Sequence, residues 1–277
     1  MTTSLHMNPP RRRALAIGVP LALILIAWLA ISEIGSIGQG SYPVRLSIPM
    51  HAKTATIAVD SGQLRVVPGS GSTLRVTGTA HYSIVRSRLT WTSDASGVSV
   101  RTRCLFPTGR CSFDSRIVIP ESARASVHDD SGDVTAQGLT GPVTIGVDSG
   151  SIVANALSGA VSLSTDSGDI SGSALTGSRV VIKDNSGSIN ITGLASLKVS
   201  VSDDSGDITL TFSKVPDSVR VVDSSGNITV VLPRGSTAYN VTASTSSGQR
   251  TVSVPTNSSS PHVITVLNDS GDVTVRN

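Results

Sequence analysis

The sequence predicts an all-β protein: a parallel β-solenoid with coils of about 18–23 residues, preceded by one transmembrane helix. Three observations support this expectation. A Ser-Gly-centred tripeptide recurs at a slowly widening period, apolar residues alternate with polar ones between its copies, and residues 14–32 form an uninterrupted apolar run.

The composition excludes several other classes of protein. Of the 277 residues, 15% are charged and 3% are aromatic. A helical bundle or coiled coil would need more Ala, Glu, Lys and Leu. A disordered chain usually carries more charge and fewer β-branched residues than this one. With so few aromatic rings, aliphatic side chains must form the core.

The N-terminus predicts a membrane anchor. Residues 1–13 contain Arg11, Arg12 and Arg13, which indicates a short, basic, cytoplasmic tail. The apolar run 14–32 would span roughly 28 Å as a helix, close to the thickness of the hydrocarbon core. We therefore expect a single-pass protein of the plasma membrane whose chain is extracytoplasmic beyond this signal anchor.

A cleaved signal peptide is the alternative for the same segment. Ala30-Ile31-Ser32 could serve as a cleavage site. The apolar part of a signal peptide is usually shorter, at about 7–15 residues, so we favour the uncleaved anchor. Residues 33–42 would then form a linker to the exported region.

The repeat predicts the solenoid, which we expect over residues 129–277. Its turn glycines are separated by 18, 18, 19, 19, 20, 22 and 23 residues. They are Gly132, Gly150, Gly168, Gly187, Gly206, Gly226, Gly248 and Gly271. A period near 20 residues is typical of stacked supersecondary units, each burying its apolar face against the next.

Alternation within each unit predicts two strands joined by turns. Apolar residues stand two positions after nearly every turn glycine. They are Val134, Ile152, Ile170, Ile189, Ile208, Ile228 and Val273, and Arg250 alone interrupts the column. A period of two indicates strands with one buried face.

The tripeptides themselves predict turns. Glycine adopts the positive φ that a Cβ would penalise. The Asp or Asn two positions before it, as in Asp130-Ser131-Gly132, can accept a backbone N–H two residues on and form an Asx-turn.

The region 43–128 is less regular and is expected to begin or cap the solenoid. Residues 34–128 contain 11 basic and 4 acidic side chains, whereas residues 129–277 contain 8 basic and 14 acidic ones. The basic part lies nearer the expected membrane, where it could meet anionic lipid headgroups or wall polymers. An ordinary solvated surface is the simpler interpretation.

The two cysteines, Cys104 and Cys111, flank a Pro-Thr-Gly turn signal. An oxidising compartment would allow a disulfide between them, which we favour over two reduced thiols. A zinc site would require further ligands nearby, and the sequence offers none.

The Ser-Gly-Asp-Ile/Val-x-Val repeats resemble the bacterial families of β-strand-repeat proteins known as putative adhesins, which are often domains of unknown function. Segments such as Ile117-Val118-Ile119-Pro120 strengthen the resemblance, which covers roughly residues 43–277. It implies a right-handed β-solenoid outside the membrane and carries over no catalytic residues. The irregular 43–128 region and the cysteine loop depart from the family pattern.

Catalytic motifs are weak or absent in the sequence. Asp-Ser-Gly superficially matches an aspartic-protease motif, but its many near-copies at solenoid spacing indicate structural turns. There is no Gly-x-Ser-x-Gly elbow of a serine hydrolase and no phosphate-binding loop. We therefore expect a protein that is not an enzyme, and neither a cofactor nor a nucleic-acid partner.

Calcium is the one metal that the sequence brings into consideration. The turn carboxylates Asp130, Asp148, Asp166 and Asp204 could supply oxygen ligands. The glycine-rich nonapeptide of calcium-binding β-rolls is absent, so structural Asx-turns are the favoured interpretation.

Three functions are compatible with these observations. The leading one is adhesion or envelope interaction, with a cell-wall polymer or a surface protein as partner. The second is an extracytoplasmic regulatory or sensor subunit of a membrane complex, although the cytoplasmic tail is short. The third, a carbohydrate-active β-helix enzyme, would need exposed aromatics, and Trp91 is the only Trp after residue 32.

Overall fold

The computed structural model describes residues 39–105 and 111–277. The predicted tail 1–13 and span 14–32 lie outside these residues. Within the described part of the chain, no helix is long and apolar enough to cross a membrane. Residues 39–42, expected in a linker, instead begin the first strand.

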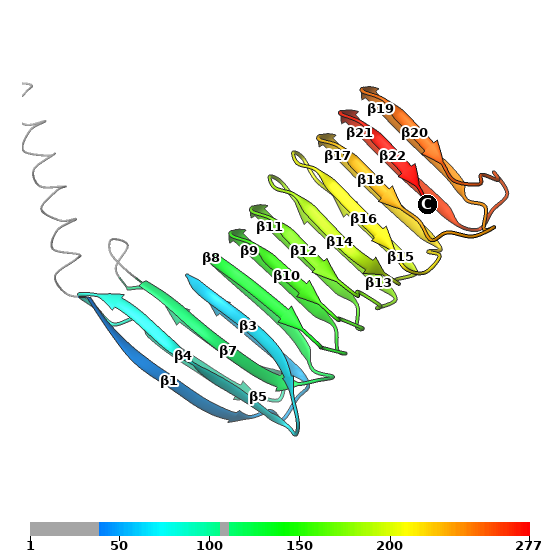
Figure 1. Cartoon of the computed structure of the whole chain (residues 1–277). Coiled ribbons are helices and arrows are strands. Elements are labelled where there is room, and N and C mark those ends of the chain that lie inside the picture. Colours follow the sequence, from blue (N-terminus) through cyan, green and yellow to red (C-terminus); the bar gives the residue numbers. More distant parts are fainter. Residues whose placement is uncertain (1–38, 106–110) are drawn as a thin grey trace, which may run out of the picture.

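The described chain is all-β, as predicted, and its coils stack into a long double layer (Figure 1). Each regular coil contributes one strand to each of two faces. Face B contains β5 (Arg88–Asp94), β6 (Gly97–Arg103), β2 (Thr54–Val59), β8 (Arg124–Gln137), β9 (Val143–Ser149), β11 (Val161–Ser167), β13 (Arg179–Asp184), β15 (Lys198–Ser202), β17 (Ser218–Ser225), β21 (Val263–Ser270) and β19 (Asn240–Ser247), in that spatial order.

Face A lies on the other side of each turn glycine. It contains β1 (Gln39–Pro49), β4 (Thr73–Ser83), β7 (Cys111–Pro120), β3 (Gly62–Gly69), the second half of β8, β10 (Ile152–Asn155), β12 (Ile170–Ser173), β14 (Ile189–Leu194), β16 (Ile208–Phe212), β18 (Ile228–Val231), β22 (Val273–Arg276) and β20 (Arg250–Ser253).

Aliphatic ladders fill the narrow space between the two faces. On face A, Ile152, Ile170 and Ile189 stand in register, and all three are fully buried. Phe113, Phe212 and Tyr239 are the buried aromatic residues of the described chain. Since neighbouring parallel strands lie about 4.8 Å apart, each aliphatic side chain packs directly on its equivalent in the next coil.

The turn glycines allow the coils to approach each other closely. Gly206 has a φ of 153°, and a Cβ there would lie 1.7 Å from the carbonyl oxygen of Gly187 in the neighbouring coil. Each turn glycine contacts its neighbour in this way, so the column forms an edge where face B turns into face A. We call it the glycine edge.

The order of the coils departs from the order of the sequence at both ends. The coil of β2 and β3 lies directly on β8, pairing Gly62 with Gly132, although residues 70–123 intervene in the chain. The regular stack therefore starts at Thr54, before the expected boundary at residue 129, which falls inside β8.

At the other end, the last coil is inserted into the stack. β21 and β22 pair with β17 and β18 on one side and with β19 and β20 on the other (Figure 1). The coil of residues 240–253 is thus terminal. This position explains Arg250, which is exposed because no further coil of the described residues packs on it.

The N-terminal end is covered by antiparallel strands. β1 pairs with β4, β4 with β7, and β5 with β6, all antiparallel. These pairings end the parallel ladder and protect the first coil from further strand addition.

Candidate functional site

The glycine edge and face B carry the chemically notable side chains of the described chain. In each coil, three positions at this edge form columns along the stack. The outer column is two residues before the turn glycine, the inner column is three residues before it, and the third column is the residue just after it.

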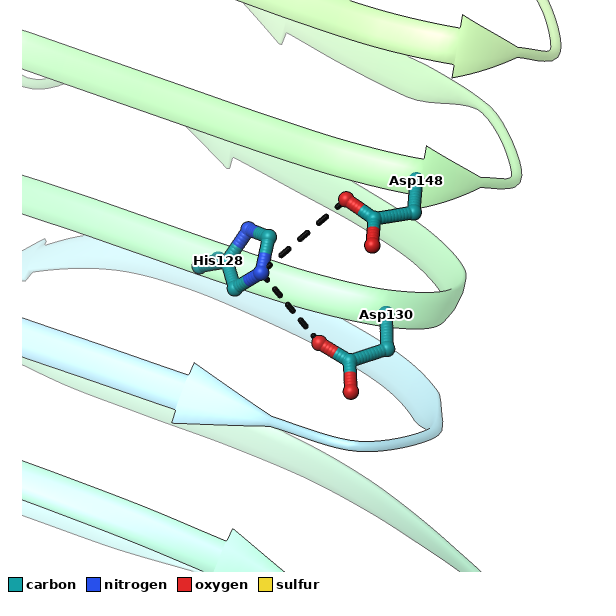
Figure 2. Close-up of side chains that lie close together, drawn as sticks. All are labelled: His128, Asp130 and Asp148. Carbon is teal, nitrogen blue, oxygen red and sulfur yellow. Dashed lines mark ion pairs between the residues drawn. The ribbon is translucent and has the colours of Figure 1, made fainter.

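The outer column contains the predicted calcium ligands, and the structure brings only two of them together. Asp130 and Asp148 flank His128, whose Nε2 lies 3.2 Å from Oδ1 of Asp130 and 3.9 Å from Oδ1 of Asp148 (Figure 2). Asp166 instead accepts a hydrogen bond from Nδ2 of Asn185 at 3.2 Å. The imidazole and the amide offset the repulsion between carboxylates one coil apart.

The group His128, Asp130 and Asp148 is the only one in the described residues whose ligand atoms could hold a metal ion. These atoms lie within 4.8 Å of one another, and all three side chains are exposed. One imidazole with two carboxylates suits a transition metal better than calcium, which prefers oxygen ligands throughout. Neither Asp166 nor Asp204 belongs to the group, so the four predicted calcium ligands do not converge.

Carboxylates of the third column accept hydrogen bonds from the backbone of the neighbouring coil. Asp133 accepts the backbone N–H of Ser151 at 3.0 Å, and Asp169 accepts that of Ser188 at 2.9 Å. Asp207 and Asp272 repeat the arrangement at 2.8 Å. These bonds explain why Asp alternates with Ser, Asn or Gln in this column, since each carboxylate needs an N–H rather than a second carboxylate opposite it.

In the Asx-turns, the acceptor differs from the residue expected from the sequence. The acceptors are not the outer aspartates but the residues one position earlier. Oδ1 of Asp184 accepts the N–H of Ser186 at 3.2 Å, for example. The residues that act in this way are Asp129, Asp184, Asp203 and Asp223.

All four inner aspartates are buried, with at most 3% of their surface exposed. In each of them Oδ2 has no hydrogen-bond partner. Burial raises the pKa of Asp129 to about 7 and that of Asp184 to about 6. Burial also raises the pKa of Asp203 and Asp223. Sequence reasoning missed this column, although the alternation Val180, Ile182, Asp184 already placed it on the inward face.

Face B carries a basic strip, which we define as Arg179, Lys198 and Arg220. They point outward from the adjacent strands β13, β15 and β17 and line a groove of about 230 Å³. Arg179 stands directly opposite Lys198 in the register. Every ion pair within residues 39–105 and 111–277 involves a histidine, so none of the three cations has a carboxylate partner.

The two cysteines lie near the first Asp-Ser-Gly turn, at the N-terminal end of the stack. Cys104 and Cys111 are joined by a disulfide, with their Cα atoms 6.0 Å apart. The backbone N–H of Cys104 donates to Oδ2 of Asp60 at 2.7 Å. Cys104 is thereby linked to the first Asp-Ser-Gly turn of the chain.

The Toastrack DUF4097 family matches residues 116–276, which is more than half of the chain. The chain belongs to this family. The match begins within β7 and covers the coils from β8 onward, whereas the resemblance in the sequence was expected to extend back to about residue 43.

Solved structures at low sequence identity resemble the chain in fold. A putative adhesin of Bacteroides fragilis is 14% identical, with a TM-score of 0.51 over 88% of this chain and 98% of that one. A putative cell adhesion protein of Clostridium sporogenes is 11% identical, with a TM-score of 0.32 over 86% and 99% of the two chains. At these identities the likeness concerns the fold of the Toastrack chain alone. No curated protein matches the sequence.

Proposed function

We propose that this protein is a non-enzymatic, membrane-anchored, extracytoplasmic β-stack that binds an anionic polymer of the cell envelope through face B. The basic strip is the observation that carries this proposal. Arg179 and Lys198 lie opposite each other on neighbouring strands, an arrangement that destabilises a sheet. Folding alone gives no reason for it, whereas a polyanion in the groove would neutralise all three cations.

The surroundings of the strip agree with such a ligand. Residues 129–277 carry an excess of acidic side chains, yet the strip has no acidic neighbour within ion-pair distance. Ser200 and Ser218 line the same groove, and Ser162 lies beside it on the neighbouring strand β11. A flat, hydroxyl-rich sheet with a cationic groove suits a long, flexible chain better than a compact small molecule.

The N-terminal sequence supports the proposed location. The basic tail and the apolar run 14–32 predict a single-pass anchor with the stack on the outer side of the membrane. A disulfide between Cys104 and Cys111 fits an oxidising compartment. The right-handed sense of the coils remains part of this proposal.

The described side chains also favour a binding role over a catalytic one. No histidine side chain in residues 39–105 and 111–277 is hydrogen-bonded to a serine hydroxyl, as a hydrolytic triad would require. The names of the structural neighbours refer to adhesion.

Co-sedimentation with isolated cell walls tests the proposal. Full-length protein in detergent should sediment with intact walls and lose most of its binding once the anionic polymers have been extracted from them. Equal binding to extracted walls would indicate a surface protein or the neutral wall as the ligand and would contradict the proposal.

A further inference from the structure

The inner column of the glycine edge contains donors, acids and apolar residues at one structurally equivalent position. Each member stands three residues before the turn glycine of its coil. In stack order the members are Val59, Asp129, Val147, Thr165, Asp184, Asp203, Asp223, Asn268 and Thr245. The side chains point into the stack, beside the glycine of the neighbouring coil.

The neutral polar members all make the same hydrogen bond. Asn268 donates from Nδ2 to the carbonyl oxygen of Gly226 at 2.8 Å, and Thr245 donates from Oγ1 to that of Gly271 at 2.8 Å. Thr165 donates to the carbonyl oxygen of Gly150 at 3.4 Å. In each case the acceptor is the turn glycine of the preceding coil in the stack.

Aspartates stand at the same position in other coils. An ionised aspartate has no hydrogen-bond donor and could not make this bond. Asp184, Asp203 and Asp223 each use Oδ1 to accept a serine N–H, which leaves Oδ2 buried and without a partner. The equivalent atom in Asn268 is a donor. A carboxylate oxygen facing a carbonyl oxygen would leave two buried acceptors in contact, which is costly.

We propose that Asp184, Asp203 and Asp223 are neutral carboxylic acids in the folded stack, each donating from Oδ2 to the turn-glycine carbonyl of the preceding coil. The acceptors are Gly168, Gly187 and Gly206, by equivalence with the bonds that Asn268, Thr245 and Thr165 make. The three acids belong to consecutive coils and form a protonated ladder.

The charged groups around the ladder all oppose its ionisation. Asp203 and Asp169 act on Asp184, Asp204 acts on Asp203, and Asp203 and Asp207 act on Asp223. No cation offsets these carboxylates, and the register partners of Asp184 on β11 and of Asp223 on β21 are the buried neutral residues Thr165 and Asn268. Burial therefore raises the pKa of each acid, to about 6 for Asp184.

The ladder makes the stability of the stack depend on pH. Because the pKa is higher in the folded state, the folded chain holds protons that the unfolded chain releases. The stabilising contribution is complete below the unfolded pKa, near 4, and is lost as the pH rises through the folded value. We expect the glycine edge to stabilise the folded stack most in acid and to contribute less above about pH 6.

Thermal unfolding of full-length protein in detergent between pH 4 and pH 8 tests the proposal. The test variant is D184N/D203N/D223N, which supplies a permanent donor of the same shape. Wild type should lose roughly 5 °C or more in Tm between pH 5 and pH 8, whereas the variant should lose much less and melt higher than wild type at pH 8.

The matched control is D166N/D269N, which removes two exposed carboxylates of the outer column that are not among the charges acting on the ladder. It should keep the pH profile of wild type. Infrared spectra should show the carbonyl band of protonated carboxyl groups in wild type at pH 5, reduced in the ladder variant and retained in the control. Parallel pH profiles of wild type and ladder variant, or a ladder variant that fails to fold, would overturn the proposal, because Asn already occupies this position at residue 268.

Discussion

Asn268 donates from Nδ2 to the carbonyl oxygen of Gly226 across 2.8 Å, linking the last coil of the sequence to the coil beneath it. This bond shows how a polar residue is accommodated in the inner column, namely as a buried donor to the glycine carbonyl of the neighbouring coil. Replacing this asparagine by aspartate should make the stability of its coil depend on pH, as the aspartate ladder does for its own coils.

The variant Asn268→Asp should unfold like wild type at pH 4 and at a lower temperature than wild type at pH 8. In acid the new carboxyl can donate as the amide does, whereas an ionised one would face the Gly226 carbonyl. Circular-dichroism melting curves would measure the difference. Asn257→Asp is the control, because Oδ1 of Asn257 only accepts a bond from the exposed Ser259 N–H, which a carboxylate can also do.

The variant Gly206→Ala should destabilise the stack strongly, by about 3 kcal/mol or more. Its φ is unfavourable for Ala, and the new Cβ would collide with the Gly187 carbonyl. Gly235→Ala separates these effects, because Gly235 has a φ of 157° but no atom within 4 Å of a Cβ. We expect that control to cost only about 1 kcal/mol in denaturant unfolding. Equal losses would show that coil spacing does not depend on the glycine column.

Several features of the fold could be predicted from the sequence because they repeat. Alternation and the glycine period identified the strands, the turns and the all-β class. The order of the coils could not be predicted, because residues 240–253 and 263–276 carry the same pattern and either could lie next to β17. Arg250 was noticed as an interruption of the apolar column, but its meaning became clear only when the structure placed its coil at the end of the stack.

The candidate site was predicted less well, for a similar reason. The sequence identified the Asp-Ser-Gly turns and two of the residues in the His128 group, Asp130 and Asp148. It directed attention to the exposed outer column, since carboxylates are usually solvated, and the buried inner column went unnoticed. The basic strip was also missed, because Arg179, Lys198 and Arg220 are about 20 residues apart and meet only when the coils stack.

Cysteine cross-linking should confirm the inserted position of the last coil. Ser225 is in register with Ser270, and Ser270 is in register with Ser247, so Ser225 and Ser247 lie two coils apart. The pair S225C/S270C should form a disulfide under mild oxidation, and the pair S225C/S247C should not. The reverse result would mean that the coils stack in sequence order.

Calcium at millimolar concentration should leave the melting temperature unchanged. Asp130 and Asp148 share His128, while Asp166 is bonded to Asn185, so no all-oxygen site forms in the described part of the chain. The measurement is a thermal melt with calcium, with calcium plus chelator, and with neither. A chelator-sensitive rise of several degrees would contradict this interpretation of the outer column.

The affinity of full-length protein in detergent for a purified anionic wall polymer shows whether the basic strip binds such a polymer. The comparison is between wild type, the strip variant R179S/K198S/R220S, and the control K214S/R234S/R250S, which removes three exposed cations elsewhere on the stack. We expect binding that weakens with added salt, falls about tenfold or more in the strip variant, and is largely kept in the control. Equal affinity of strip variant and wild type, or an equal loss in both variants, would contradict this expectation.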